Sequence, residues 1–523
     1  MRIIIIGAVA AGTSAAAKAR RNNENAEIVV YERDHHISYS GCGMPYYIGG
    51  DIENADALTP RDSAFFKSKY NVDIFISHEV LAILPNEKRV KVKNLTTGEV
   101  FTDYYEKLVI ATGARATIPP IEGSGHERVF TLRNINDMNR IRKFIDTQKP
   151  KTAVIIGTGF VGLEMCENLK TLGLEITLIE RLSQVTPRLD SDMAVHVQNH
   201  IEKNNITVLT NTSVKEITES SVILSDNNET KADMVIVTTG VRPNTELAKA
   251  AGIELGVAGA IRVNTKMETN LPDIYACGDC TEQFHLVTGK PVYQPLGSTA
   301  NKTGRITGDS MTGGNLEFRG ILGTGIFRVF DMTVAQTGLS EREAKEQGYE
   351  VAVCHNIKPN KPDYMGGKEM IIKGIADRNN GRMLGVQIVG GEGVDKRLDV
   401  FVTAITFKAK AEDLFHLDLA YAPPYSTTKD PVMYTGMILD NAINRGRQLI
   451  TSKELDTLMQ SGEKYNLIDA RVVSQYEKSH IDTAENIPHK NLRNTSETLD
   501  KDTVAITYCN KGVTGNAAQN ILI

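Results

Sequence analysis

The sequence predicts an α/β protein made of several domains built around parallel sheets. Two observations indicate this class. A glycine-rich turn connects an apolar strand to a helix at residues 7–12, and the same pattern recurs at residues 157–162. The chain has 523 residues, which is too long for a single hydrophobic core. We therefore expect two nested strand–turn–helix units followed by further domains.

Composition excludes several classes of protein. The chain is 41% hydrophobic and 24% charged, as is usual for globular proteins. A net charge of −5 gives no indication of a nucleic-acid partner. Six cysteines are too few for a disulfide scaffold of this length, and no apolar run approaches the ~20 residues of a membrane span. We expect a cytoplasmic protein without nucleic-acid, membrane or metal binding.

The first unit is a predicted βαβ element at the N-terminus. Residues 2–6 form an apolar strand, residues 13–21 a helix, and residues 28–31 a second strand. This order, with a glycine turn after the first strand, is typical of Rossmann-like dinucleotide-binding folds. An apolar N-terminus can also indicate a signal peptide, but the glycine turn and the charged helix that follow favour a buried strand.

Each part of the first turn has a physical reason. Gly7 permits the tight turn, and Gly12 permits close packing of the helix on the strand. Val9 or Ala10 stands where the middle glycine is usual, so the motif is a variant. The helix N-terminus offers N–H groups to a pyrophosphate, and Glu32 can bind ribose hydroxyls.

The second unit carries a complete glycine fingerprint, Gly157-Thr158-Gly159-Phe160-Val161-Gly162. The flanking strands are predicted at residues 153–156 and 175–179, with a helix over residues 163–172 that Gly173 caps. Two such units imply two nucleotides, one held tightly and one diffusible.

Glu180 ends the second strand of this unit and bears on the choice of nicotinamide. Its carboxylate would accept hydrogen bonds from a free 2′-hydroxyl and repel a 2′-phosphate, which favours NADH over NADPH. Arg181 and Arg188 lie nearby in the sequence and could soften this preference. The alternative interpretation of both arginines is a solvated surface.

Three further strands end in small or acidic residues. Residues 108–113 and 235–240 each run into a glycine turn, and residues 274–279 end at Asp279. An aspartate in that position can hydrogen-bond ribityl hydroxyls. The order of these elements makes the second nucleotide unit an insertion within the first nucleotide domain.

Cys42 is the candidate redox residue. It follows the first nucleotide unit in Ser38-Tyr39-Ser40-Gly41-Cys42-Gly43, and no second cysteine lies close enough in the sequence for a local disulfide. A lone thiol beside a bound cofactor must react with an external group, such as a small disulfide, a persulfide or a peroxide.

With these motifs, residues 1 to about 445 resemble the pyridine nucleotide–disulfide oxidoreductases. Within them the chain is similar to the single-cysteine branch of coenzyme A disulfide reductase, with NADH oxidase and NADH peroxidase as relatives. The resemblance implies FAD at the first site and NADH or NADPH at the second. It places Cys42 beside the flavin as a thiolate with charge-transfer absorbance, and Glu164 near the contact between nicotinamide and flavin.

The resemblance and the motifs together name the residues expected to bind cofactors. For FAD these are Gly7, Ala8, Ala10, Ala11, Gly12, Glu32, Arg33, Val80, Ala111, Thr112, Gly113, Gly278, Asp279 and Ala300. For NAD(P)H they are Gly157, Thr158, Gly159, Phe160, Val161, Gly162, Glu164, Glu180 and Gly240.

Tyrosines are the expected proton donors to a leaving thiolate. Tyr421 and Tyr425 lie in a segment similar to the one that faces the partner's cysteine in this family. Tyr364 follows Asp363, at a place where relatives often carry two adjacent tyrosines. Which of those two tyrosines Tyr364 corresponds to is therefore undecided. The alternative for Tyr421 and Tyr425 is simple packing beside two prolines.

Coenzyme A would be the substrate or a bound ligand, and four residues are candidates to contact it: Arg20, Arg21, Ser38 and Ser40. Ordinary surface charge at a helix C-terminus explains the two arginines equally well.

The remaining cysteines have a structural alternative. Cys277 and Cys280 form C-x-x-C, which indicates either a redox pair or small packed side chains. Cys166 falls within a predicted helix and Cys354 within an apolar strand, so both are expected in the core.

The composition changes after residue 447, and the last 70 or so residues resemble a rhodanese-like α/β domain. Cys509 ends a predicted strand and opens a glycine loop before a helix, an arrangement that lowers a thiol pKa and can hold a persulfide. Two features depart from the family: Thr514 stands where relatives commonly carry arginine, and the chain stops before the last strand and helix of a rhodanese. An inactive docking module is the alternative.

The expected domains are an FAD-binding domain in two segments (1–112 and 245–318), an NAD(P)H-binding domain (113–244), an α+β dimerisation domain (319–446) and an incomplete rhodanese-like domain (452–523). The resemblance implies a homodimer in which the partner's dimerisation domain completes the active site.

The expected function is reduction of coenzyme A disulfide, coenzyme A persulfide or polysulfide by NAD(P)H through FAD and Cys42, with sulfur transfer by the tail. One alternative is an NADH oxidase or peroxidase that cycles through a cysteine sulfenic acid. Another is a redox-sensing protein that reads NADH and docks a partner through the tail.

Overall fold

The computed structural model describes residues 1–523, and the chain forms two compact units. The first contains Met1–Pro187 and Gln198–Gly323, and the second contains Arg188–Val197 and Thr324–Ile523. No helix is both long and apolar enough to cross a membrane.

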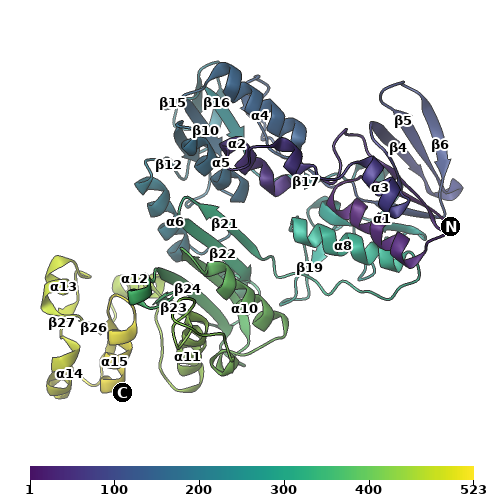
Figure 1. The fold of residues 1–523 in the computed structure, drawn as a ribbon. Coiled ribbons are helices and arrows are strands. Elements are labelled where there is room, and N and C mark those ends of the chain that lie inside the picture. The colour runs from purple at the N-terminus through teal and green to yellow at the C-terminus, as the bar shows by residue number, and fades with distance from the viewer. The chain divides into compact units, whose positions relative to one another are not determined.

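The first unit contains a five-stranded parallel sheet with the N-terminal strand at its centre (Figure 1). Its strand order is β18 (Ile274–Ala276), β7 (Lys107–Ile110), β1 (Arg2–Ile6), β2 (Glu27–Tyr31) and β3 (Asp73–Phe75). The strands are apolar because both faces are covered, as a parallel sheet requires.

Two helices cover one face of this sheet, α1 (Ala10–Asn22) and α8 (Gly297–Ser310), which lie side by side in Figure 1. Their axes approach closely because α8 presents glycine: a Cβ at Gly304 would overlap the carbonyl of Ala11, and one at Gly308 would overlap that of Ala15. The opposite face packs on the antiparallel sheet of β4 (His78–Leu84), β5 (Arg89–Asn94) and β6 (Val100–Tyr104).

A second parallel sheet lies within the first unit. Its order is β12 (Thr207–Leu209), β11 (Glu175–Ile179), β10 (Thr152–Ile156), β16 (Met234–Val237) and β9 (Val129–Phe130). The helices α4 (Ile135–Gln148) and α5 (Phe160–Thr171) accompany it, and α6 (Ser191–Lys203) precedes β12. A three-stranded antiparallel sheet of β13 (Val214–Ile217), β14 (Ser221–Leu224) and β15 (Glu229–Lys231) completes this fold.

The chain enters the second nucleotide fold from the first and returns to it. The chain leaves the first sheet after β7 and returns to it at β18, beside β7. A two-stranded ribbon of β8 (Ala114–Ala116) and β17 (Val241–Pro243) carries the chain out and back. Thr112 and Asn244 flank this ribbon.

One segment departs from the predicted boundaries. Arg188–Val197 groups with the second unit, although we expected residues 113–244 to form one domain. The reason is electrostatic: the carboxylates of Asp190 and Asp192 pair with the ammonium of Lys373, a side chain 1% exposed. Burying that charge requires these partners.

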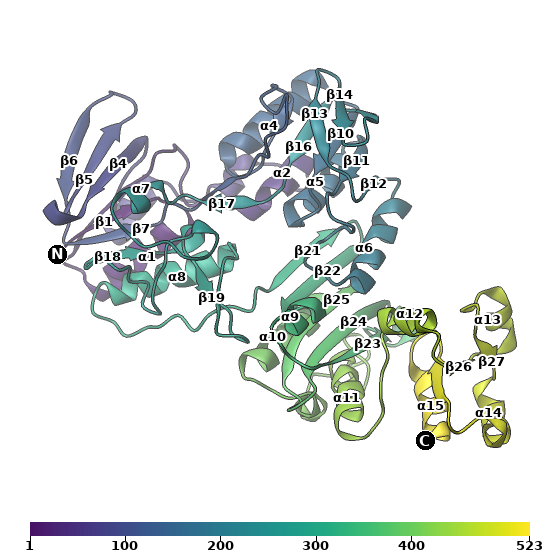
Figure 2. The ribbon, with the colours of Figure 1, turned by 180° about the vertical axis from the view of Figure 1, so that it is seen from behind.

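The second unit begins with a five-stranded antiparallel sheet. Its order is β21 (Gly325–Val329), β22 (Met332–Gly338), β25 (Met383–Gly390), β24 (Glu369–Asp377) and β23 (Val351–Pro359). The helix α10 (Val394–Thr406) lies along β22 and β25, and α11 (Pro431–Asn444) lies beside β23 (Figure 2). The short helix α9 (Glu341–Glu346) begins with a capping box at Ser340.

The C-terminal part is a small α/β layer. Three parallel strands, β27 (Glu485–Asn486), β26 (Tyr465–Asp469) and β28 (Val504–Tyr508), are accompanied by α12 (Ser452–Ser461), α13 (Val473–Lys478), α14 (His489–Thr495) and α15 (Val513–Leu522). Its apolar core lies on both faces of β26, around Leu467 on one and Ile468 on the other.

The predicted helix starts after both glycine turns are late by three residues. The helix α1 starts at Ala10 rather than residue 13, and α5 starts at Phe160 rather than residue 163. Gly12 and Gly162 each lie within the first turn of their helix and do not interrupt it. Glycine is needed there because the backbone of the preceding turn lies too close for a side chain. Backbone N–H groups of the first turn therefore begin directly at the glycine loop.

Candidate functional site

The first glycine turn is fixed by contacts that leave no room for a side chain. Gly7 has φ +106°, a left-handed conformation, and a Cβ there would overlap the carbonyl oxygen of Ala111. A Cβ at Gly12 would overlap the carbonyl of Gly7. The roles predicted for both glycines are thus those that the packing requires.

The acidic residue at the end of β2 holds the same turn. The Ala8 N–H donates to Glu32 Oε2 over 2.8 Å, and the Asp34 N–H donates to Oε1 over 2.9 Å. Glu32 is buried, and desolvation raises the pKa of its carboxyl group. Arg33 is exposed beside it.

Segments far apart in the sequence converge on this turn. A Cβ on Gly278 would lie 2.7 Å from Ala11 Cβ and 3.8 Å from Ala300 Cβ, so three predicted cofactor residues lie together. Thr112 Oγ1 donates to the Asn244 carbonyl over 2.6 Å, beside Gly113. The Val80 side chain is buried in β4 and faces the sheet.

The second glycine turn repeats the arrangement of the first. A Cβ on Gly162 would overlap the Gly157 carbonyl, and one on Gly157 would lie 2.8 Å from the Thr238 carbonyl oxygen. A Cβ on Gly159 would instead meet nothing within 4 Å. The middle glycine therefore faces open space before the α5 N-terminus, as a cradle for a pyrophosphate requires.

Glu180 occupies the place that Glu32 has in the first fold. Its Oε2 accepts hydrogen bonds from the Thr158 N–H (3.1 Å) and hydroxyl (2.7 Å), and its Oε1 accepts one from the Leu182 N–H (3.0 Å). Arg181 is exposed, whereas Arg188 belongs to the second unit. There burial lowers the pKa of Arg188 and the Glu343 carboxylate opposes that shift.

The two kinds of glycine in this turn predict opposite outcomes for two alanine variants. Gly162→Ala should destabilise the protein by about 1–3 kcal/mol, because the added methyl group overlaps the Gly157 carbonyl. Gly159→Ala should change the unfolding free energy by less than about 1 kcal/mol but weaken NADH binding roughly tenfold or more, which is ~1.4 kcal/mol.

Thermal unfolding and NADH titration of both variants check this pair. Unimpaired NADH binding by Gly159→Ala would show that the pyrophosphate does not bind at the α5 N-terminus.

Cys42 lies where the chain enters a short helix of the first unit. It is in the middle of the 3₁₀ turn Gly41–Gly43, which leads into α2 (Met44–Gly49), and it is the one exposed cysteine of the chain. The helix α2 packs on α5 of the inserted fold, because Gly49 leaves room for the Asn168 side chain. This contact places the thiol next to the second nucleotide fold.

Charged side chains around Cys42 act on its thiol in opposite directions. Desolvation raises the pKa of Cys42, and the carboxylates of Glu164 and Asp279 raise it further, whereas Arg133 lowers it. Desolvation also raises the pKa of Glu164 to about 7, and a hydrogen bond from the Tyr46 hydroxyl (3.5 Å) opposes that shift.

Arg133 is a site residue that sequence reasoning missed. Its Nη2 pairs with Asp279 Oδ2 over 2.6 Å, and its Nε donates to the Ala114 carbonyl over 2.9 Å. It is the one cation that lowers the pKa of Cys42. No local motif marks it, because it lies in a loop between β9 and α4.

The charge of Glu164 gives Cys42 a testable pH dependence. Above pH 7 the ionised carboxylate disfavours the thiolate, so Glu164→Gln should speed alkylation of Cys42, by up to about fivefold for ~1 kcal/mol of screened interaction. Below pH 7 Glu164 is largely protonated, and the two proteins should react alike.

Iodoacetamide labelling of Cys42 from pH 6 to pH 9 measures this difference. Parallel profiles over the whole range would show that Glu164 does not act on the thiol.

The four predicted coenzyme A contacts differ in availability. Arg20 is buried, and its guanidinium donates to the carbonyl oxygens of Tyr70 (2.7 Å) and Asn71 (2.9 Å), which supports the structural alternative for this residue. Arg21 remains exposed over the Tyr70 ring. Ser40 is exposed beside Cys42, and Ser38 has a left-handed backbone with φ +49°.

The C-x-x-C pair is not placed for redox chemistry. Cys277 and Cys280 are both fully buried and belong to the apolar clusters on opposite faces of the first sheet. Burial raises the pKa of Cys280 to about 11 and that of Cys277 further. Cys166 and Cys354 are buried as well. The packing interpretation holds for all four.

The predicted catalytic tyrosines lie in the second unit, and two of them share a pocket. Tyr421 and Tyr425 line a pocket of about 520 Å³ together with Lys361, Lys396 and Arg397. Their side chains are 49% and 72% exposed, so they are not packed into a core. Tyr364 lies outside this pocket and is 75% exposed.

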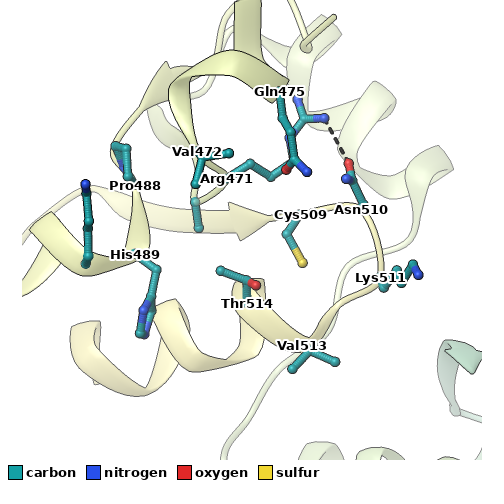
Figure 3. Close-up of a pocket in the computed structure, with 12 residues that line it drawn as sticks. Arg471, Val472, Gln475, Pro488, His489, Cys509, Asn510, Lys511, Val513 and Thr514 are labelled. Carbon is teal, nitrogen blue, oxygen red and sulfur yellow. Dashed lines mark hydrogen bonds between the residues drawn. The ribbon is translucent and has the colours of Figure 1, made fainter. Parts of the chain in front are cut away.

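Cys509 lies in a second pocket, of about 510 Å³, in the C-terminal part (Figure 3). Its sulfur points into the pocket between Thr514 and Lys511, and the Gly515 N–H donates to Sγ over 3.2 Å. The thiol thus sits at the N-terminus of α15, as the sequence predicts.

Two of the cations around this pocket are paired with carboxylates. Arg471 pairs with buried Asp469 over 2.6 Å and donates to Asn510 Oδ1 over 2.9 Å, the bond drawn in Figure 3. Lys511 pairs with Glu369. Thr514 places a hydroxyl-bearing side chain, and no charge, beside the sulfur.

Two dinucleotide folds beside one exposed thiol define a pyridine-nucleotide-dependent oxidoreductase. The model of the pyridine nucleotide-disulphide oxidoreductases matches residues 1–295, and the model of that family's dimerisation domain matches residues 326–431. The chain belongs to this family. A rhodanese-like domain model matches residues 451–523.

Individual relatives agree with this assignment. The chain is 37% identical to an NADH oxidase of Methanocaldococcus jannaschii over 83% of this chain and 97% of that protein. It is 36% identical to the CoA-dependent NAD(P)H sulfur oxidoreductase of Pyrococcus furiosus over 84% of this chain and 99% of that protein.

Two solved structures extend over the whole chain. Reduced Bacillus anthracis CoADR-RHD has a TM-score of 0.97 and 37% identity, and covers 100% of this chain and 94% of its own. A NAD-dependent persulfide reductase from A. fulgidus has a TM-score of 0.92 and 36% identity, and covers 100% of this chain and 96% of its own.

Proposed function

We propose that the protein is an FAD-dependent NAD(P)H oxidoreductase that reduces coenzyme A disulfide, coenzyme A persulfide or polysulfide through Cys42. The observation that carries this proposal is the one exposed cysteine, placed beside two dinucleotide folds. The relatives named for coenzyme A-dependent sulfur reduction and for persulfide reduction support the choice of substrates.

The residues present fit both cofactors. The open space at Gly159 before the α5 N-terminus suits the pyrophosphate of NAD(P)H, and the paired Glu180 suits its ribose. The converging Ala11, Gly278 and Ala300, with Asp279 nearby, suit FAD. When bound, FAD supplies two-electron transfer from NAD(P)H to sulfur.

The remaining predicted cofactor contacts belong to the same proposal. They are Gly7, Ala8, Ala10, Gly12, Glu32, Arg33, Val80, Ala111, Thr112 and Gly113 for FAD, and Gly157, Thr158, Phe160, Val161, Gly162, Glu164 and Gly240 for NAD(P)H. The bonds of Glu180 to Thr158 and Leu182 support a preference for NADH, because an acidic group there repels a 2′-phosphate.

Cys42 performs the exchange with the substrate. Its thiolate attacks one sulfur of coenzyme A disulfide, so that a mixed disulfide forms and one coenzyme A thiolate leaves and takes up a proton. Two electrons and a further proton then release the second coenzyme A as a thiol and restore the Cys42 thiolate. Arg133 supports the thiolate, because it is the cation that lowers the pKa of Cys42.

Tyrosines of a partner subunit are the proposed proton donors to the leaving thiolate. The chain carries the family's dimerisation domain, and the exposed Tyr421 and Tyr425 share a pocket large enough for part of a substrate. Tyr364 is the third candidate. Arg21, Ser38 and Ser40 are proposed to contact coenzyme A, and a cytoplasmic location fits an enzyme whose cysteines are all free.

A second candidate function is reduction of oxygen or peroxide, because one relative is an NADH oxidase. Cys42 would then cycle through a sulfenic acid. The experiment that decides is NADH consumption with coenzyme A disulfide, coenzyme A persulfide, polysulfide, peroxide and oxygen, compared by kcat/KM. A higher kcat/KM for oxygen or peroxide than for every sulfur substrate would overturn the proposal.

Cys42→Ser tests the proposed nucleophile. The variant should keep bound FAD, because no FAD contact is removed, but lose long-wavelength charge-transfer absorbance and all turnover with coenzyme A disulfide. Absorbance spectra and steady-state rates measure both effects. Full turnover in this variant would refute the mechanism, and Cys354→Ser, at a buried cysteine, is the matched control.

The C-terminal domain is proposed to transfer sulfur through Cys509. The Gly515 N–H bond to its sulfur and the surrounding pocket support a cradle for a persulfide. Fusion to the reductase raises the effective concentration at which a persulfide meets Cys42.

Cys509→Ser should therefore slow reactions that begin from a sulfur donor and leave reduction of coenzyme A disulfide unchanged, because that step needs only Cys42 and its cofactors. Parallel assays with the two substrates measure this. If Cys509→Ser and the wild type have equal donor-dependent rates, the domain serves only for docking. If the variant loses activity equally on both substrates, Cys509 has a structural role.

A further inference from the structure

Arg397 is a buried arginine that connects the segments carrying the predicted catalytic tyrosines. It lies in the first half of α10 and is 1% exposed. Its Nη2 donates to Asp430 Oδ2 (2.8 Å), Ser426 Oγ (3.2 Å) and the Asn360 carbonyl (2.9 Å). One planar guanidinium thus connects two segments that are far apart in the sequence, at Asn360 and at Ser426–Asp430.

Two of these positions lie in segments that carry a predicted catalytic tyrosine. Asn360 begins the connection that contains Tyr364, and it closes that connection by bonds to the backbone of Lys368 in both directions (2.8 and 2.9 Å). Ser426 directly follows Tyr425. Arg397 therefore sets the spacing between the Tyr364 connection and the Tyr425 segment.

The tyrosines have no side-chain hydrogen bond of their own to fix them. Tyr421 and Tyr425 depend on the path of their backbone, where the amides of Tyr425 and Ser426 both donate to the Ala422 carbonyl (2.9 and 3.1 Å). Arg397 itself lines the pocket that the two tyrosines share. A shift of this backbone would move both hydroxyl groups at once.

The packing of α10 does not depend on Arg397. Leu398, Phe401 and Ile405 of this helix are buried as apolar side chains, and the helix lies along β22 and β25. The guanidinium points instead to loops, so its loss leaves the contact between helix and sheet in place. Asp430 also caps α11 through the Val432 N–H (3.0 Å).

We propose that Arg397 is a positioning residue that holds Tyr421 and Tyr425 in register with the Tyr364 connection, and so shapes the pocket in which they meet the sulfur substrate. This proposal rests on the proposed function, in which these tyrosines serve the reaction at a partner's thiol. Arg397 acts through Asp430, Ser426 and Asn360, and touches no reacting atom itself.

Arg397→Lys and Arg397→Met test the proposal in the full-length, FAD-loaded protein. Lysine keeps the charge but cannot bind three acceptors in one plane. Asp430→Asn keeps the helix cap and weakens the tie. Lys373→Met is the matched control in the same unit. It breaks a buried ion cluster with Asp190, Asp192 and Glu341, and none of these partners lies in a segment that carries a predicted catalytic tyrosine.

Two activities are measured on each variant: NADH-dependent reduction of the best sulfur substrate, and reduction of ferricyanide, which needs no tyrosine. Arg397→Met and Arg397→Lys should lower kcat/KM for the sulfur substrate by about 100-fold, as a misplacement of ~1 Å does, with ferricyanide reduction within about twofold of wild type. Lys373→Met should affect both activities alike. Equal loss of both activities in the Arg397 variants, or unchanged sulfur kinetics, overturns the proposal.

Hydrogen exchange separates this proposal from the proposed function. In Arg397→Met, backbone amides of residues 420–430 should exchange faster, and in Lys373→Met they should not. If the wild type reduces no sulfur substrate, the proposed function fails while exchange still tests the positioning role. Unchanged exchange in residues 420–430 of Arg397→Met contradicts that role directly.

Discussion

The nucleotide sites depend on the close packing of each glycine turn against backbone at the end of a neighbouring strand. In the first fold the backbone of Gly7 rests on Ala111 and that of Gly12 rests on Gly7. In the second fold the backbone of Gly157 packs against Thr238, and that of Gly162 packs against Gly157 and Thr238. Because these approaches leave no room for a side chain, strand, turn and helix form one rigid piece, and the first helical turn is aimed at the place a pyrophosphate would take.

The same pieces also place the thiol. The helix that follows Cys42 packs on α5, the helix that follows the second glycine turn. One contact therefore connects the thiol, the acidic Glu164 and the second nucleotide fold. The electrostatics of this region are mixed, because Glu164 and Asp279 disfavour the thiolate and Arg133 favours it. Such opposed influences are common where a pKa is adjusted for chemistry.

In the second unit, buried charged side chains fix the positions of loops, whereas in the first unit closely packed glycines fix the nucleotide turns. Lys373 holds the segment that contains Asp190 and Asp192, and Arg397 holds the loops around the tyrosines. A buried charge that loses its partner costs about 3–5 kcal/mol, so each cluster strongly favours one arrangement of its loops. Loops that carry exposed tyrosines obtain a fixed geometry in this way without packing the tyrosines themselves.

Local sequence pattern determined the nucleotide folds, the nested order of the strands, Cys42 and the cysteine at the N-terminus of the last long helix. Glycine turns, apolar strands and terminal acids are short-range signals, because their physical causes act within about 30 residues. The position of Arg133, the tie made by Arg397 and the burial of Arg20 have no such signal. They depend on partners tens to hundreds of residues away, such as Asp279 for Arg133 and Tyr70 for Arg20. Only the tertiary structure brings those partners together, and so only it could show which arginines are structural and which charge acts on the thiol.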